Sequence, residues 1–209
     1  MEAEPTTTEA SPRSRASEVL LFASNFLRNP QMLGSIVPSS RSLVNKVLAP
    51  IDWSRARVVV EYGPGVGTFT AEMLRRMRGD ARLIAIETNL EFVQFIGTSF
   101  PDHRLRIEHD SAQNVARVLR RLGIARASCI VSGIPLGSMS KELQTEIAVA
   151  SRDLLEPGGP LCVYQFTSRV LPVLRRTFPQ VRRSVEIRNF PPAQLFVCKG
   201  PQTTGAASR

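Results

Sequence analysis

The stretch Val58-Val59-Val60-Glu61-Tyr62-Gly63-Pro64-Gly65-Val66-Gly67-Thr68 decides the fold of this 209-residue chain. Its β-branched start is typical of a buried strand. The strand ends on Glu61, and the glycines after it open a turn into a helix. In a strand-turn-helix unit of this kind, ligands bind at the carboxyl end of the strand. We therefore expect Glu61 and the glycine loop to border a ligand site.

The spacing of the glycines distinguishes two kinds of ligand. The dinucleotide-binding fingerprint places its third glycine three residues after the second, and that position is Thr68 here. Gly63 would make the turn, Gly65 would let a ligand approach the backbone, and Gly67 would let the helix close on the strand. The loop thus disfavours a pyrophosphate and fits the cationic cofactor S-adenosylmethionine. A tight turn without a ligand is the alternative.

Acidic residues also follow the next two predicted strands. The strand over residues 82–87 ends on Glu87, 24 residues after Gly63. That is close to the offset of about twenty residues at which an acid meets ribose hydroxyls. The strand over 105–108 is followed by Asp110 and Ser111, which could bond an adenine amino group. These side chains predict an adenosine site along one edge of the sheet.

The rest of the chain predicts the remainder of an α/β fold. A fourth strand over 127–132 leads into loop 133–138, which would border the transferred group. A fifth strand covers 161–166. The strands over 181–187 and 193–199 must be antiparallel because their connection is too short for a crossover. We expect a Rossmann-like seven-stranded sheet, mostly parallel with an antiparallel last strand and with helices on both faces.

The predicted domain organisation is one domain over residues 17–199. Residues 1–16 lack hydrophobic periodicity and are expected to be a disordered tail, and residues 200–209 a flexible tail. An amphipathic helix over 17–28 would lie in a lipid interface or pack on its own domain. The serine-rich loop that follows it, which includes Ser39, could fold over a cofactor.

The composition of the chain indicates which partners and which location to expect for the protein. The 27 basic and 18 acidic residues give a net charge of +9. This charge favours nucleic acid or an anionic membrane as a partner, although an arginine-rich coding bias would give the same count. Two histidines are too few for a metal site, so no metal is expected. No apolar run of about eighteen residues or secretory signal occurs, so we expect a cytoplasmic protein that associates peripherally, if at all, with membranes.

Six segments together resemble a known family: residues 26–30, 34–41, 61–70, 87–89, 132–136 and 164–167. Over roughly residues 26–199 the chain is similar to the class I S-adenosylmethionine-dependent methyltransferases. Within them it resembles the bacterial phospholipid N-methyltransferases, which convert phosphatidylethanolamine stepwise to phosphatidylcholine. These enzymes are related to the ribosomal RNA adenine dimethyltransferases.

The resemblance implies roles for the candidate residues. The methionine portion of the cofactor would be held by Glu61, Gly63, Gly65 and Gly67, the ribose by Glu87, and the adenine by Asp110 and Ser111. Ser132 and Ser39 would complete the cofactor site. The substrate would lie against Ile134, Pro135, Tyr164 and Gln165. The leading helix would bind the inner membrane, whose anionic phospholipid surface attracts basic side chains.

The expected reaction is methyl transfer from S-adenosylmethionine to the amine of phosphatidylethanolamine and its methylated derivatives. Candidates for the base are Glu61, His109, Tyr164 and Asp110, and none stands out. RNA adenine dimethyltransferases carry an aromatic residue after the proline of loop 133–138, where this chain has Leu136, so nucleic acid is not the expected acceptor. RNA adenine N-methylation and a catalytically weak cofactor-binding protein are the alternatives.

Overall fold

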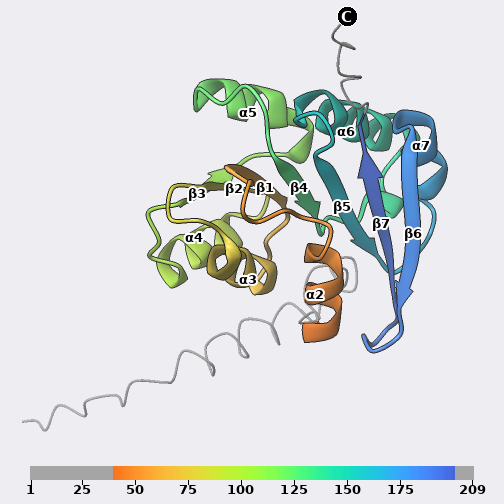
Figure 1. Cartoon of the computed structure of the whole chain (residues 1–209), viewed down its shortest axis with the longest axis horizontal. Helices are drawn as coiled ribbons and strands as arrows, with labels where there is room; N and C mark the ends of the chain where they lie inside the picture. The colour runs from red at the N-terminus through yellow and green to blue at the C-terminus, as the bar shows by residue number, and fades with distance from the viewer. Residues whose placement is uncertain (1–39, 201–209) are drawn as a thin grey trace, which may run out of the picture.

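The computed structural model describes residues 40–200, which form a seven-stranded sheet between two layers of helices (Figure 1). The strand order is β3-β2-β1-β4-β5-β7-β6. All neighbouring pairs are parallel except those that β7 makes, which are antiparallel. The predicted fold class is therefore confirmed. The strands are β1 (Val58–Tyr62), β2 (Arg82–Glu87), β3 (Leu105–His109), β4 (Cys129–Ser132), β5 (Pro160–Gln165), β6 (Gln180–Glu186) and β7 (Ala193–Lys199).

The described residues also contain six α-helices and two short 3-10 helices. They are α2 (Arg41–Leu48), α3 (Thr68–Arg76), α4 (Leu90–Ser99), η2 (Ala112–Asn114), α5 (Val115–Arg121), η3 (Leu136–Ser138), α6 (Lys141–Leu154) and α7 (Leu171–Thr177). Apolar side chains of α2 and α3 pack on one face of the sheet. Those of α5, α6 and α7 pack on the other face.

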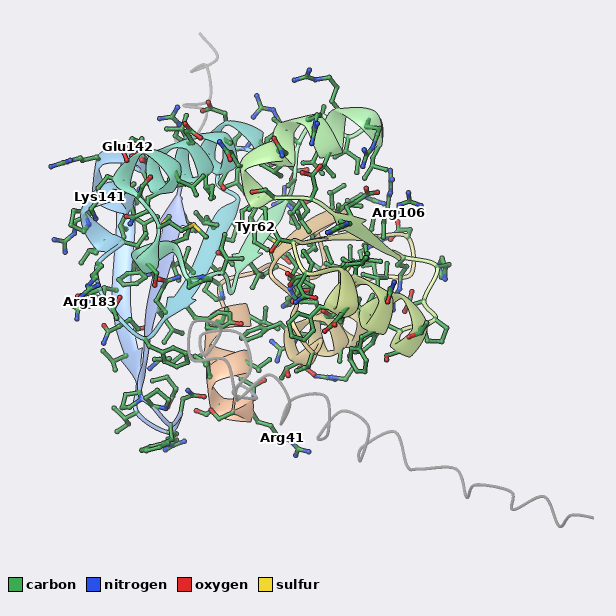
Figure 2. All side chains as sticks on the ribbon, turned by 180° about the vertical axis from the view of Figure 1, so that it is seen from behind. Arg41, Tyr62, Arg106, Lys141, Glu142 and Arg183 are labelled. Carbon is green, nitrogen blue, oxygen red and sulfur yellow. The ribbon has the colours of Figure 1, made fainter. Side chains whose placement is uncertain are left out.

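The alternation of side chains along β1 decides which layer each residue meets. Val60 and Tyr62 belong to the core beneath α5, α6 and α7, whereas Val59 packs towards α2 and α3. The buried Tyr62 hydroxyl lies 3.1 Å from Ser151 Oγ of α6, and Figure 2 shows Tyr62 at the centre of the molecule. Glu61 points the opposite way and meets α3.

Local signals set the helix starts. Ser40 Oγ accepts a hydrogen bond from Leu43 N at 3.1 Å and so caps α2. Asn89 caps α4 in the same way. The sequence predicts one helix over 112–122, but Ser111 instead caps the 3-10 turn η2, and α5 begins after it.

The three cysteines are unpaired and buried within β4, β5 and β7. Burial raises the pKa of the Cys162 thiol to about 12 and that of Cys129 well above its usual value. These thiols are therefore protonated core side chains.

Some predictions fall on residues outside the described range. They are the tail 1–16, the amphipathic helix 17–28, the cofactor-site residue Ser39 and the tail after Gly200. Within residues 40–200, every helix is too short or too polar to span a bilayer.

Candidate active site

The candidate site lies where β1, β2 and β4 end. Tyr62 pairs with Ile86 of β2 and with Ser132 of β4, so the three strands end at the same level. The loops that follow them therefore meet at one edge of the sheet. In Figure 1, β4 and β5 point towards this edge, and α2 lies beside it.

The glycine loop depends on backbone angles that favour glycine. Gly63, Gly65 and Gly67 have φ values of +69°, +53° and +83°. A Cβ on Gly63 would lie 2.7 Å from Ile134 Cγ2, so this glycine lets loop 133–138 approach. A Cβ on Gly67 would lie 2.4 Å from the Phe100 ring. The sequence predicts that Gly67 closes the helix on the strand, but its close contact is with the end of α4.

We expect Gly67→Ala to lower the free energy of unfolding by about 2–4 kcal/mol. About 1 kcal/mol of this is backbone strain, and the remainder is the clash with the Phe100 ring. Gly123→Ala is the matched control, because Gly123 has a φ of +69° and open space around its Cβ position. Urea denaturation of both variants separates strain from packing. Equal losses in the two variants would show that the Phe100 contact has no cost.

Glu87 connects β2 to the glycine loop. Its Oε1 accepts hydrogen bonds from the backbone nitrogens of Thr88 at 2.8 Å and Asn89 at 2.9 Å. Its Oε2 accepts a longer one, 3.4 Å, from Gly65 N. The carboxylate is thus fixed beside the loop by its own chain. This is the placement that a ribose-binding acid requires.

Glu61 is a buried acid facing α3. Its side chain accepts a 2.7 Å hydrogen bond from Thr70 Oγ1, and the residue is 2% exposed. Burial raises its pKa to about 8; the Thr70 hydrogen bond opposes the rise, and the nearby Glu87 carboxyl adds to it. Glu61 is therefore mostly protonated at neutral pH until a cation approaches.

Asp110 and Ser111 lie at the end of β3 but are engaged by the following helix. Asp110 accepts hydrogen bonds from Asn114 Nδ2 at 2.8 Å and Arg117 at 2.9 Å. Burial opposes ionisation of Asp110, but these bonds outweigh it and lower the pKa. Ser111 Oγ accepts from Gln113 N at the start of η2. Their role towards adenine stays a prediction.

The Gln165 side chain is hydrogen-bonded to the loop that follows β4. Its Oε1 accepts a 2.9 Å hydrogen bond from Gly137 N, and its Nε2 donates one of 2.6 Å to the Ile134 carbonyl. Gln165 therefore positions the loop that carries Ile134 and Pro135. Pro135 is exposed and Ile134 is half-buried.

Tyr164 and Phe69 form an aromatic wall between α3 and this loop. Their rings stack at 4.6 Å with 19° between the planes. A Cβ on Gly133 would lie 2.4 Å from the Tyr164 hydroxyl oxygen and 3.2 Å from the Gly63 carbonyl. Neither Phe69 nor Thr70 is among the site residues that the sequence predicts. Phe69 and Thr70 lie in the first turn after the glycine loop, and this position is the sequence signal that could have identified both residues.

Ser132 supplies a test of whether this edge suits a ligand. Its hydroxyl is buried and has no hydrogen-bond partner among the described residues. Buried hydroxyls normally have one. The orphan hydroxyl, the glycine amides and the two acids together fit a polar, cationic cofactor. Within residues 40–200, His, Cys, Asp and Glu side chains form no group of three that could hold a metal ion.

His109 is an exposed residue at the end of β3, paired in register with Glu87. Its Nε2 lies 3.0 Å from the Thr88 carbonyl oxygen, to which it donates. This nitrogen is therefore already engaged by the backbone, which leaves Nδ1 as the atom that could accept a proton.

Comparison with known proteins gives both close and distant similarities, although no family model matches the chain. It is 30% identical over 191 residues to ornithine lipid N-methyltransferase of Singulisphaera acidiphila, covering 88% of this chain and 96% of that protein. A match of 29% over 69 residues, 33% of this chain and 25% of the relative, is to ribosomal RNA small subunit methyltransferase A of Mycoplasma capricolum. The N-methyltransferase NodS of Bradyrhizobium japonicum, solved with S-adenosyl-L-homocysteine, gives a TM-score of 0.64 at 13% identity, covering 88% of this chain and 99% of that one.

The strand order, the glycine loop and the acids at the strand ends define a class I S-adenosylmethionine-dependent methyltransferase. The predicted cofactor, S-adenosylmethionine, is the methyl donor of this class. The chain belongs to the N-methyltransferase family that includes the ornithine lipid N-methyltransferase of S. acidiphila.

Proposed function

We propose that this protein transfers a methyl group from S-adenosylmethionine to the amine of a lipid headgroup. The observation that carries the proposal is the similarity to ornithine lipid N-methyltransferase along almost the whole length of both chains. The earlier resemblance suggests phosphatidylethanolamine and its methylated derivatives, leading to phosphatidylcholine. Both acceptors are lipids whose headgroup bears an amine, and we propose that class of acceptor.

Different residues of the site would hold the cofactor and the lipid acceptor. When bound, S-adenosylmethionine supplies the methyl group, which the amine attacks in line with the breaking bond to sulfur. Glu87 and the glycine-loop amides would hold the nucleoside part, and Glu61 the positively charged methionine part. Loop 133–138 and Tyr164 would face the acceptor. Positioning of this kind accounts for much of the acceleration of a displacement reaction.

The amine must lose a proton before it attacks, and the structure describes the surroundings of each candidate base. Glu61 is buried and bonded to Thr70. His109 donates from Nε2 to the Thr88 carbonyl. Asp110 is paired with Arg117. The assignment of a base, including Tyr164, therefore stays open.

The proposed setting is the cytoplasmic face of the inner membrane. The net charge of +9 favours an anionic lipid surface. The predicted helix over residues 17–28 would be one membrane-binding element. A lipid acceptor keeps its acyl chains in the bilayer, so the enzyme would work from the surface.

RNA is the second candidate acceptor, because of the partial match to a ribosomal RNA methyltransferase. The position of Leu136 disfavours base stacking at loop 133–138. Leu136 is 3% exposed and belongs to the core, so it offers no platform to a flipped base. The lipid acceptor is therefore the better supported of the two.

The test is to incubate the protein with labelled S-adenosylmethionine and vesicles containing ornithine lipid or phosphatidylethanolamine. We expect label in the lipid headgroup, lost in Glu87→Ala. A parallel reaction receives ribosomal RNA instead of lipid. Label in RNA alone would establish the second candidate, and tight cofactor binding without transfer to either would indicate a binding protein.

A further inference from the structure

Two large apolar side chains project into solvent where β6 turns into β7. Ile187 is 79% exposed and Phe190 is 89% exposed. Leu90, the next most exposed large apolar residue in the described range, is at 52%. Apolar side chains that gather in water at one point mark an interaction site. We call residues 187–192 the hairpin tip.

The hairpin tip lies at the same edge of the sheet as the candidate site. Gln194 of β7 pairs with Gln165 at the end of β5 and with Val185 near the end of β6. Strands β5 and β6 therefore end at about the same level, and the tip extends beyond them. Figure 1 shows the tip and α2 together at the lower side of the molecule.

Hydrogen bonds hold the hairpin tip against the start of α2. The buried Asn189 accepts a 3.0 Å bond from Ser40 N and donates one of 2.8 Å to the Pro191 carbonyl. Lys46 Nζ donates to the Val185 carbonyl at 2.6 Å. With its backbone fixed in this way, the tip presents Ile187 and Phe190 outwards.

Basic side chains flank strand β6, which leads to the hairpin tip. A groove of about 540 Å³ runs along β6 and the neighbouring part of β7, from the end of the hairpin opposite the tip. Four of its lining residues are basic and none is acidic: Lys46, Ala49, Pro50, Gln180, Arg182, Arg183, Ser184, Val197 and Lys199. Arg188 is exposed on the tip itself. In Figure 2, Arg183 projects from the outer edge of the sheet.

An apolar tip that carries Arg188 and follows a strand flanked by cations matches the interface of an anionic bilayer. Apolar side chains enter the boundary of the acyl region, and arginine and lysine meet the lipid phosphates. RNA would satisfy the cations equally well but offers no hydrocarbon phase to Ile187. The surface therefore fits lipid better than nucleic acid.

We propose that the hairpin tip is a membrane-docking element that inserts Ile187 and Phe190 into an anionic lipid surface. Docking there brings the edge of the sheet that carries the site against the bilayer. The inference rests on the proposed function, because a lipid acceptor explains why the site should face a membrane. It assigns a membrane contact in addition to the predicted helix over residues 17–28.

The experiment measures sedimentation of the full chain with vesicles of phosphatidylglycerol and phosphatidylcholine, neither of which carries a primary amine. We expect Ile187→Ser with Phe190→Ser to weaken binding at least about tenfold. Arg182→Gln with Arg183→Gln should weaken it about tenfold on these vesicles. All proteins retain residues 17–28, so any difference belongs to the hairpin.

Two matched controls make the same chemical changes elsewhere. Leu90→Ser removes an exposed apolar side chain from α4, and Arg175→Gln with Arg176→Gln removes two exposed charges from α7. Neither should change vesicle binding by more than about twofold. Unchanged S-adenosylmethionine affinity and thermal midpoints show that the variants fold.

Hairpin variants that bind vesicles like the unmodified chain would overturn the proposal, as would equal losses in the controls. Altered RNA binding or altered self-association, with vesicle binding intact, would assign the surface to another partner and also overturn it. Failure of the proposed function looks different: vesicle binding would still depend on the hairpin, while no lipid amine would be methylated.

Discussion

Replacing Glu87 with alanine is expected to raise the dissociation constant for S-adenosylmethionine at least about a hundredfold. Two hydrogen bonds from ribose hydroxyls to a carboxylate contribute about 3 kcal/mol together, which corresponds to that factor. The substitution also removes the acceptor for Thr88 N, Asn89 N and Gly65 N, so the glycine loop loses its anchor. Isothermal titration calorimetry measures the change directly.

Glu72→Ala is the matched control for this prediction. Glu72, like Glu87, is a carboxylate that accepts several hydrogen bonds, in this case from the side chains of Arg75 and Arg76. It lies on α3, away from the strand ends. Its loss should leave cofactor affinity within about twofold, because surface ion pairs contribute little. A Glu87→Ala protein that binds the cofactor as tightly as the control would remove Glu87 from the ribose site.

The parts of the fold that sequence predicts well are those set by local pattern. The run before Glu61, its glycine loop and Glu87 at the next strand end each follow from neighbouring residues. The antiparallel pairing of β6 and β7 follows from a connection too short for a crossover. The family relation then confirms the class of methyltransferase.

The parts that sequence does not predict depend on contacts between distant residues. Gln165 looks like a free polar side chain beside the substrate, yet both ends of its amide are bonded to loop 133–138. The pair of Ser40 and Asn189 is 149 positions apart. Such contacts follow from the crossing of loops at the sheet edge, which no local periodicity encodes.

The hairpin tip, proposed as a second lipid-facing surface, is not indicated by any sequence pattern. Sequence patterns direct attention to the apolar periodicity of residues 17–28, because helices show a repeating signal. Ile187 and Phe190 lie in a loop and have no periodicity, so only their exposure distinguishes them from core residues. The membrane contact proposed for this turn therefore rests on the three-dimensional structure alone.

Glu61→Gln is expected to remove most of the pH dependence of the unliganded protein's stability between about pH 5 and 8. In the folded protein, burial raises the pKa of Glu61 from 4.5 to about 8. Between these values the folded chain holds a proton that the unfolded chain has released. The stabilisation is therefore complete below the unfolded pKa and is lost as the pH rises through the folded one. The variant has an uncharged amide at every pH.

The shift of the Glu61 pKa corresponds to a change on the order of 5 kcal/mol in the free energy of unfolding over the full range. Urea denaturation at about pH 5 and about pH 9 measures the free energy of unfolding. This free energy should fall strongly between the two pH values for the unmodified protein and much less for Glu61→Gln. For the control Glu91→Gln, which changes an exposed residue, it should fall as much as for the unmodified protein. S-adenosylmethionine should bind the unmodified protein more tightly as pH rises through about 8, because the ionised carboxylate pairs with a cation. The affinity of Glu61→Gln for S-adenosylmethionine should not change with pH over this range. If the two proteins instead showed parallel pH profiles, Glu61 would not titrate in this range.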